Sequence, residues 1–318
     1  MSGNERPLVT LAIFAYNQSR YVAEAVAGAL AQDYSPLEII LSDDCSSDET
    51  FGIMQHAARN YRGPHEIVLN RNSINLNIGS HVNKVGGLTR GDFIVLAAGD
   101  DVSLPDRVTV LVNAWQSAGA GPALLYSDMS AIDENSAPFD LGNETVDPGP
   151  HSIEAMARGA GVLGATTAMT RDIFDRFPPL SPLVIHEDRV LPFRAFLLGG
   201  TVIYVDEELV KYRAVGGMSR QIPTTLRDYL MVYTPTNARR TLPDALQRLS
   251  DVLYLRPEER HLRHLCEAAI ADHESRLDLH ASSKWAYELV FLRWLFKGAS
   301  KLPLLKHYLK LRFVSVFG

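Results

Sequence analysis

The chain has 318 residues, only two cysteines and no long apolar run. Cys45 and Cys266 lie far apart in the sequence, which excludes a framework of disulfide bonds and favours a reducing compartment. No stretch of 18 or more apolar residues is free of charge, so no transmembrane helix is predicted. The polar start MSGNERP has neither the basic first part nor the apolar core of a signal peptide. We therefore expect a cytoplasmic protein, either free or at the inner face of the membrane.

Several common catalytic motifs are also absent. The sequence has no P-loop, no GxSxG and no GxGxxG, and its ten histidines include no convincing metal-spaced pair. Charge is distributed unevenly: residues 1–222 hold 27 acidic and 16 basic residues, whereas residues 223–318 hold 10 acidic and 15 basic residues. Because the first part is strongly acidic, it is unsuited to a nucleic-acid surface, and no nucleic-acid partner is expected.

Apolar runs alternate with helical patterns in the first part of the chain. The expected strands are 8–14, 37–41, 66–69, 92–98 and 123–127, separated by helices at 21–32, 48–61, 80–88 and 105–118. Such alternation predicts an α/β fold with a mostly parallel sheet flanked by helices. Residues 128–150 read as a polar loop, and a further helix is expected at 185–198. We predict one α/β domain over 1–222 and a helical C-terminal region over 223–318.

Polar residues follow the predicted strands, at the point where each strand ends. Tyr16-Asn17 follows the first strand, Asp43-Asp44 the second, 70–77 the third and Asp100-Asp101 the fourth. Ligands of open parallel sheets bind at the carboxyl ends of the strands, so these groups are expected to surround one site.

Two adjacent carboxylates at Asp100-Asp101 are costly to place together unless a cation neutralises them. Their hard oxygen atoms suit Mn²⁺ or Mg²⁺, which would stabilise charge on a diphosphate leaving group. The alternative is a cap for the helix that Pro105 opens, with Asp101 and Ser103 just before it. The other strand-end groups favour the metal.

The remaining candidates each have a structural alternative. A carboxylate at Asp43-Asp44 could accept the N3–H of uracil or thymine, which would favour UDP or dTDP donors; the alternative is a turn and helix cap. Tyr16 could stack on a base or simply pack. Glu187-Asp188 offers a general base for an attacking hydroxyl, or else stabilises the dipole of its helix.

These residues lie in segments that resemble the family 2 inverting glycosyltransferases with the GT-A fold. The segment LAIFAYNQSRYVAEAVAGALAQDYSPLEIILSDDCSSDET (11–50) is similar to the family's opening block, and NIGSHVNKVGGLTRGDFIVLAAGDDVSLPDRV (77–108) to its DxD-type block. HEDRVLPFRAFLLGG (186–200) is similar to the ED-type catalytic segment, and LVKYRAVGGMS (209–219) to the closing block. The four segments occur in the family's order.

On the nucleotide side, the resemblance implies that Phe14 and Tyr16 lie against the nucleotide and that Asp44 meets the base. It also implies that Asn83 lies near the donor and that Arg213, with the loop after it, closes over the diphosphate.

On the catalytic side, the resemblance implies that Asp101 ligates the metal and that Asp100 contacts the ribose or the metal region. Asp188 would be the catalytic base, with Glu187 beside it. Two positions depart from the family pattern: Val102 stands where many members have a third acid, and Val215 where many have a histidine.

The expected reaction is inverting transfer of a sugar from a nucleotide-sugar donor to a hydroxyl acceptor, as in the synthesis of bacterial surface polysaccharides. The acceptor would be a glycan or a lipid-linked sugar. The alternatives are a nucleotidyltransferase, which would usually show a glycine-rich basic loop near the first strand, and a non-catalytic nucleotide-sugar-binding protein.

The end of the chain, 281–318, combines seven Lys or Arg and one Glu with several aromatic residues. This composition is typical of a helix lying on an anionic membrane surface, and it would suit a lipid-linked acceptor. The alternatives are packing on the core and contact with a second copy in a homodimer.

Overall fold

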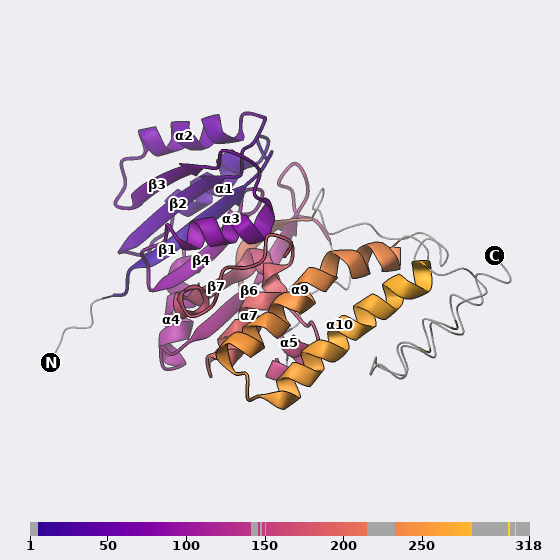
Figure 1. Ribbon diagram of the computed structural model, residues 1–318. Coiled ribbons are helices and arrows are strands. Elements are labelled where there is room, and N and C mark those ends of the chain that lie inside the picture. The colour runs from indigo at the N-terminus through magenta and orange to yellow at the C-terminus, as the bar shows by residue number, and fades with distance from the viewer. Residues whose placement is uncertain are drawn as a thin grey trace.

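The computed structural model describes residues 6–140, 146, 148–149, 151–214, 233–281, 305 and 309. An eight-stranded sheet lies between helices, and two long helices, α9 and α10, lie side by side against one end of this α/β part (Figure 1). The strands are β1 (Val9–Ala15), β2 (Leu37–Asp43), β3 (Glu66–Arg71), β4 (Phe93–Ala98), β5 (Val102–Ser103), β6 (Ala123–Ile132), β7 (Thr167–Thr170) and β8 (Thr201–Arg213).

The sheet has the order β3-β2-β1-β4-β7-β6-β8-β5. Its first half is parallel: β1 pairs with β2 and β4, and β2 pairs with β3. The short strand β7 then lies antiparallel between β4 and β6, and β8 returns parallel to β6. The predicted mostly parallel α/β fold is confirmed, with the antiparallel pairings confined to β7 and to the two-residue β5, which pairs with the end of β8.

The helices are α1 (Val22–Leu30), α2 (Thr50–Asn60), α3 (Asn77–Gly86), α4 (Arg107–Ser117), α5 (Ile153–Ala157), α6 (Asp172–Asp175), α7 (Glu187–Leu197), α9 (Thr234–Leu255), α10 (Arg260–Ala281) and the 3-10 turn η1 (Gly164–Thr166). Alternate residues of each strand point to opposite faces of the sheet. Val9, Leu11 and Ile13 of β1 therefore share one core with α1, α2 and α4. The other face, which includes Ile94 and Leu96 of β4, packs against α3, α6 and α7.

Two local expectations were wrong. The segment after residue 127 was expected to be loop, but β6 continues to Ile132 because it pairs with the long strand β8. The fourth helix was expected to open at Pro105, but α4 begins at Arg107.

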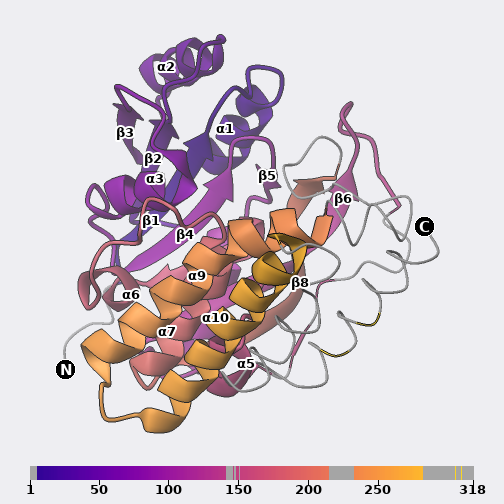
Figure 2. The ribbon, with the colours of Figure 1, turned by 45° about the vertical axis from the view of Figure 1, so that its right-hand side comes forward.

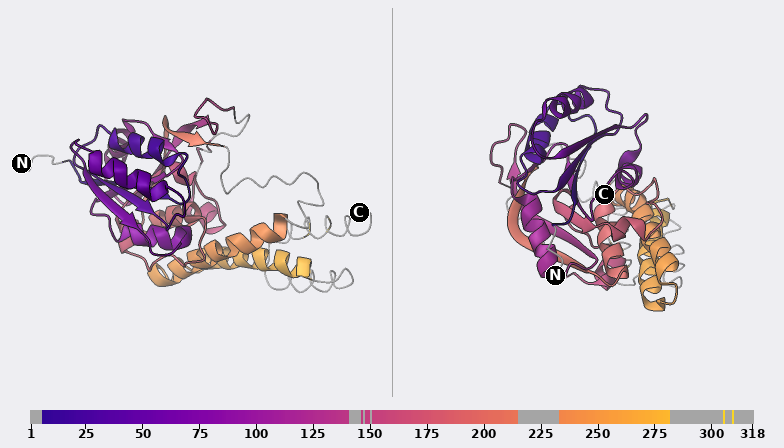
Figure 3. Two further views of the ribbon diagram at one scale, coloured as in Figure 1. Left: turned by 90° about the horizontal axis from the view of Figure 1, so that it is seen from above. Right: turned by 90° about the vertical axis from the view of Figure 1, so that its left-hand side faces the viewer.

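The helices α9 and α10 share a core with the α/β part. Val252 of α9 and Leu262, Leu265 and Cys266 of α10 are buried in one cluster with side chains of α5 and α7, among them Phe193. Figures 2 and 3 show this pair lying along α7 and projecting past the α/β part. The predicted helical character of the C-terminal region is confirmed within 233–281. The predicted membrane or dimer contact of 281–318 falls almost wholly outside the described residues. No helix in the described part of the chain is long and apolar enough to cross a membrane.

Candidate active site

The turn after β4 is held from the side by the last residue of β8. Asp101 is only 5% exposed, and its Oδ1 accepts a hydrogen bond of 2.7 Å from the backbone N–H of Arg213. The Nε of Arg213 donates to the carbonyl of Asp100 at 2.9 Å. Helix α4 starts after Asp106 without a side-chain cap, so the alternative interpretation of Asp101 as a helix cap is wrong.

Both carboxyl groups of this turn resist ionisation. Burial and the neighbouring charge of Asp100 raise the pKa of Asp101 to about 7, and burial raises the pKa of Asp100. A bound cation would relieve this cost, and carboxylate oxygens are ligands that suit Mg²⁺ or Mn²⁺.

Within the described residues, no three His, Cys, Asp or Glu side chains converge on one point. The pair therefore fits a divalent ion that takes its other ligands from substrate phosphates and water, as Mg²⁺ commonly does.

The ends of β1, β2 and β4 meet at the same edge of the sheet. The backbone N–H of Asp44 donates to the carbonyl of Ala15, and the N–H of Gly99 donates to the carbonyl of Phe14. A Cβ on Gly99 would lie 2.8 Å from the Cβ of Ala15, so only glycine permits this approach. Tyr16, at 47% exposure, stands at this edge with its side chain open to solvent.

Asp44 is buried at this edge and is held in place by the segment after β3. Its Oδ1 accepts from the Nδ2 of Asn72 and from the backbone N–H of Leu76. Its Oδ2 lies 4.0 Å from Nδ1 of His81, whose pKa is lowered mainly by burial. Phe14 packs edge-on against the same imidazole. The carboxylate thus has a fixed orientation, as a base-recognising group needs.

Two residues that were predicted to lie near the nucleotide-sugar donor, Asn83 and Arg213, have side chains that bind other parts of the protein. The amide of Asn83 both donates to and accepts from the backbone of Leu180. The guanidinium of Arg213 is buried over the ring of Tyr21 and donates to the carbonyl of Asp133 and to Glu24. In this structure Asn83 fixes the segment before α7, and Arg213 holds the Asp100-Asp101 turn. Contact of either side chain with a donor stays a prediction.

Glu187 and Asp188 are the first two residues of α7 and face the turn η1. A Cβ on Gly164 would lie 3.2 Å from Oε1 of Glu187 and 3.3 Å from Oδ2 of Asp188, so the missing side chain lets both carboxyls approach. Burial, followed by the charge of Asp188, raises the pKa of Glu187 to about 8. Burial also raises the pKa of Asp188, but the charges of His186 and Arg189 oppose that rise.

The turn η1 joins the two acid pairs. Arg107, fully buried at the start of α4, donates from Nη2 to the carbonyls of Ala165 in η1 and Leu96 in β4. Burial lowers the pKa of Arg107 to about 10, and the charge of Asp101 opposes that shift. Arg107 thus interacts both with the metal candidate Asp101 and with η1, against which Glu187 and Asp188 lie.

Sequence reasoning missed the contribution of α9. Asp244 is buried and accepts from the backbone N–H of Ile185 and from Nδ1 of His186, the latter at 2.7 Å. It fixes the residues that lead into the Glu187-Asp188 pair. No local pattern could reveal this contact, because 58 residues separate Asp244 from His186. The only available signal was the polar, helically spaced series Asp244, Arg248 and Asp251.

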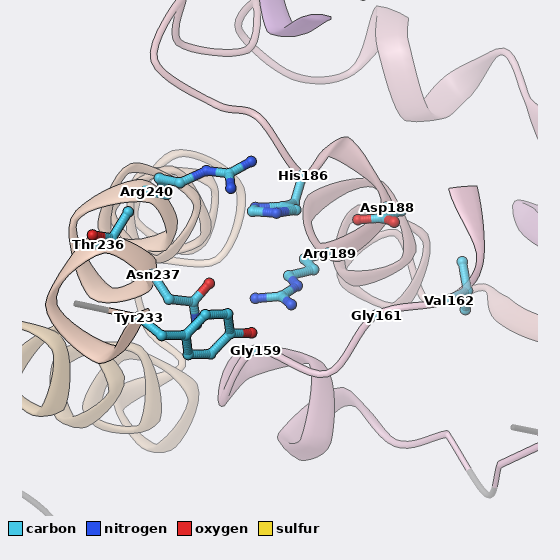
Figure 4. Close-up of a pocket in the computed structure, with 10 residues that line it drawn as sticks. All are labelled: Gly159, Gly161, Val162, His186, Asp188, Arg189, Tyr233, Thr236, Asn237 and Arg240. Carbon is cyan, nitrogen blue, oxygen red and sulfur yellow. The ribbon is translucent and has the colours of Figure 1, made fainter. Parts of the chain in front are cut away.

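A pocket of about 400 Å³ opens beside Asp188, between α7 and α9 (Figure 4). It is lined by Gly159, Gly161, Val162, His186, Asp188, Arg189, Tyr233, Thr236, Asn237 and Arg240.

The architecture is that of GT-A-type glycosyltransferases. The structure of TarS 1–349 from S. aureus in complex with UDP-GlcNAc aligns over 96% of this chain and 91% of that chain, with a TM-score of 0.56 and 16% identity. A mannosyltransferase, PcManGT, from Pyrobaculum calidifontis, in complex with GDP-Man and Mn²⁺, aligns over 98% of this chain and 89% of that chain, with a TM-score of 0.54 and 15% identity.

Part of the sequence matches a known family. Residues 10–139 match the model of glycosyl transferase family 2. The putative glycosyltransferase EpsE of Bacillus subtilis (strain 168) is 34% identical over 105 residues, which cover 33% of this chain and 37% of EpsE. The succinoglycan biosynthesis protein ExoO of Rhizobium meliloti (strain 1021) is 32% identical over 130 residues, 41% of this chain and 36% of ExoO. The chain thus matches only about a third of the length of these relatives. Asp188 lies beyond the residues that the family model matches.

Proposed function

We propose that the protein transfers a sugar from a nucleoside diphosphate donor to a hydroxyl group of an acceptor, with inversion at the anomeric carbon, in the synthesis of a bacterial surface polysaccharide or related glycan. The observation that carries the proposal is η1. Its Ala165 carbonyl accepts from Arg107, whose charge acts on Asp101, and its Gly164 lies against the Glu187-Asp188 pair. A diphosphate site and a candidate base are therefore neighbours, as direct displacement requires.

Asp188 is the better candidate for the base. Its Oδ1 is buried and has no hydrogen-bond partner among the described residues, and two cationic neighbours favour its ionised form. Glu187 has no such cation and keeps its proton near neutral pH. A base must accept a proton at the operating pH, and a carboxylate with a raised pKa does so more readily than an ordinary one.

In the proposed reaction, the acceptor oxygen forms a bond to the anomeric carbon while the bond from that carbon to the diphosphate oxygen breaks. The proton of the acceptor hydroxyl passes to Asp188, and the nucleoside diphosphate leaves on the opposite face. Asp101 and Asp100 would hold a divalent cation, which when bound neutralises charge on the diphosphate.

A uridine or thymidine diphosphate sugar is the favoured donor, because Asp44 can accept the N3–H of uracil or thymine, whereas cytosine has no such proton. We expect UDP to bind at least about tenfold more tightly than CDP, as a lost base hydrogen bond to a charged acceptor would cause. Calorimetric titration of each nucleotide in the presence of Mn²⁺ measures this ratio.

Two variants test whether Asp44 is the cause of the preference for UDP over CDP. Asp44→Asn should reduce the preference for UDP, because the amide can donate to N3 of cytosine. Asp106→Asn, an exposed carboxylate at the start of α4, should retain the wild-type preference. Equal affinity for UDP and CDP would contradict the assignment of Asp44, and absence of binding by UDP and dTDP would contradict the proposed donor.

A further inference from the structure

The pocket between α7 and α9 is lined by three segments that lie away from the predicted nucleotide site. Its lining comes from the segment 159–162, from His186, Asp188 and Arg189 at the start of α7, and from the first turns of α9. None of the lining residues belongs to the ends of β1, β2 or β4, where the nucleotide candidates lie. Asp188 is shared, so an occupant of this pocket would lie beside the candidate base rather than at the strand-end nucleotide site.

Two arginines and a histidine face the pocket, as Figure 4 shows for Arg189, Arg240 and His186. Neither Arg189 nor Arg240 has a side-chain hydrogen bond or ion pair in the part of the chain that the structure describes. Nδ1 of His186 is taken by Asp244, which leaves the opposite ring nitrogen available to the pocket. The two guanidinium groups offer hydrogen-bond donors and positive charge without acceptors to match them.

A third arginine lies behind the pocket wall. Arg248 is only 2% exposed, and its Nε and Nη1 have no hydrogen-bond partner among the described residues. Its Nη2 lies 3.2 Å from the place that a Cβ on Gly159 would take, and Gly159 itself has a φ of +106° and lines the pocket. The guanidinium of Arg248 thus lies against the backbone of Gly159, a residue of the pocket wall.

The acidic residues near Arg248 do not fully neutralise its charge, because both have other partners. Asp244 binds His186, and Asp251 forms a two-point ion pair with Arg194. Burial lowers the pKa of Arg248, and the charge of Arg189 lowers it further. A buried guanidinium with unmet donors is costly, and an anion bound among these cations would offset that cost.

We propose that this pocket binds an anionic group of the acceptor, either a phosphate or a sugar carboxylate, and so orients the acceptor hydroxyl toward Asp188. The inference rests on the proposed glycosyl transfer and adds the chemical class of its acceptor. An acceptor with a phosphate bound to a lipid or glycan, or with a uronic acid unit, would satisfy it equally, because each presents oxygens that pair with guanidinium groups.

The test uses the full chain with UDP and Mn²⁺ at saturating concentration, so that a phosphate probe cannot occupy the donor site. Methyl β-glucuronide and glucose 6-phosphate are the acidic probes, and methyl β-glucoside is the neutral one. Calorimetry should show at least one acidic probe binding about tenfold more tightly than the neutral probe, and the two acidic probes distinguish a carboxylate acceptor from a phosphate acceptor.

Arg240 and Arg239 provide a matched pair of variants, because both are exposed on α9 and only Arg240 lines the pocket. Arg240→Gln should weaken binding of the preferred acidic probe about fivefold or more, and Arg239→Gln should match the wild type. Equal affinities for acidic and neutral probes, no binding of either acidic probe at 10 mM, or equal effects of the two variants would overturn the proposal.

A separate titration with UDP and Mn²⁺ distinguishes the possible failures. If UDP binds but the probes show no preference for acids, the acceptor inference fails while the proposed function stands. If UDP does not bind, the proposed function fails as well. Loss of UDP affinity in Arg240→Gln, in parallel with the probe, would mean that the pocket holds the donor diphosphate, which also overturns the inference.

Discussion

Glu187 is a carboxyl group whose protonation depends on its position at the first residue of α7. Burial, Asp188 and Asp244 all raise its pKa, which reaches about 8 instead of the ordinary 4.5. Its Oε1 lies beside Gly164, where no side chain intervenes. One acid of the pair thus stays neutral near pH 7, and the charge of the pair is concentrated on Asp188, where His186 and Arg189 favour it.

This shift predicts how stability depends on pH. Between about pH 4.5 and pH 8 the folded state keeps a proton on Glu187 that the unfolded chain releases, so the free energy of unfolding falls as pH rises through this range. The slope from one group is at most about 1.4 kcal/mol per pH unit. Glu187→Gln should remove this part of the dependence, so its advantage in stability over the wild type should grow from pH 5 to pH 8.

Urea denaturation at several pH values, with EDTA present, measures the difference in the free energy of unfolding between Glu187→Gln and the wild type. Glu258→Gln, at an exposed glutamate after α9, serves as the control and should follow the wild type at every pH. A constant difference between Glu187→Gln and wild type across this range would show that the carboxyl of Glu187 ionises normally.

Helix α7 is joined to α9 by a buried ion pair. Arg194 donates from Nε and Nη2 to the two carboxylate oxygens of Asp251, at 2.7 and 3.0 Å, and both side chains are excluded from solvent. Gln247 donates to the same carboxylate, and a further bond from Arg194 reaches the carbonyl of Pro178. Because α7 begins with the two catalytic candidates, this contact helps to set where they lie.

Removing one member of a buried pair leaves the other charge without a partner. Asp251→Ala should therefore lower the free energy of unfolding by about 3–5 kcal/mol. Glu267→Ala removes one member of the exposed pair between Arg263 and Glu267 on α10 and should cost less than about 1 kcal/mol. Denaturant unfolding of both variants provides the comparison, and similar losses for the two would refute the special role of the buried pair.

The elements differ in how well the sequence foretold them. β1, β2, β3 and β4 were predictable because each is a continuous apolar run bounded by turn residues, and their parallel pairing follows from the helices between them. β5, with two residues, and β7, with four, are too short to show a pattern, and their pairing depends on the distant strands β8 and β6. Sequence periodicity carries no information about such partners.

The site was partly predictable because the parallel strands β1 to β4 were predictable. Tyr16, Asp44, Asp100 and Asp101 meet at one edge because they follow parallel strands, whose carboxyl ends share that edge, although their roles with substrate stay predictions. Asn83 and Arg213 were named by position within a family pattern, and only the structure shows what their side chains contact.

At the scale of the molecule, α9 and α10 are part of the structure that supports the site. They bury apolar side chains against α5 and α7, fix the approach to α7 through Asp244, and supply one wall of the pocket through residues such as Tyr233 and Arg240. We therefore propose that α9 and α10 act together with the α/β domain rather than as a separate appendage.

The central claim, that Asp188 removes the acceptor proton during sugar transfer, is tested most directly by Asp188→Asn. Release of nucleoside diphosphate from a panel of UDP- and dTDP-sugars is measured with Mn²⁺ for the wild type, Asp188→Asn and the surface control Asp106→Asn, and UDP affinity is titrated in parallel. The account predicts that Asp188→Asn turns over at least about 100-fold more slowly, because it cannot accept the proton, while UDP binds as in the wild type. Turnover by Asp188→Asn at the rate of the wild type would contradict the account.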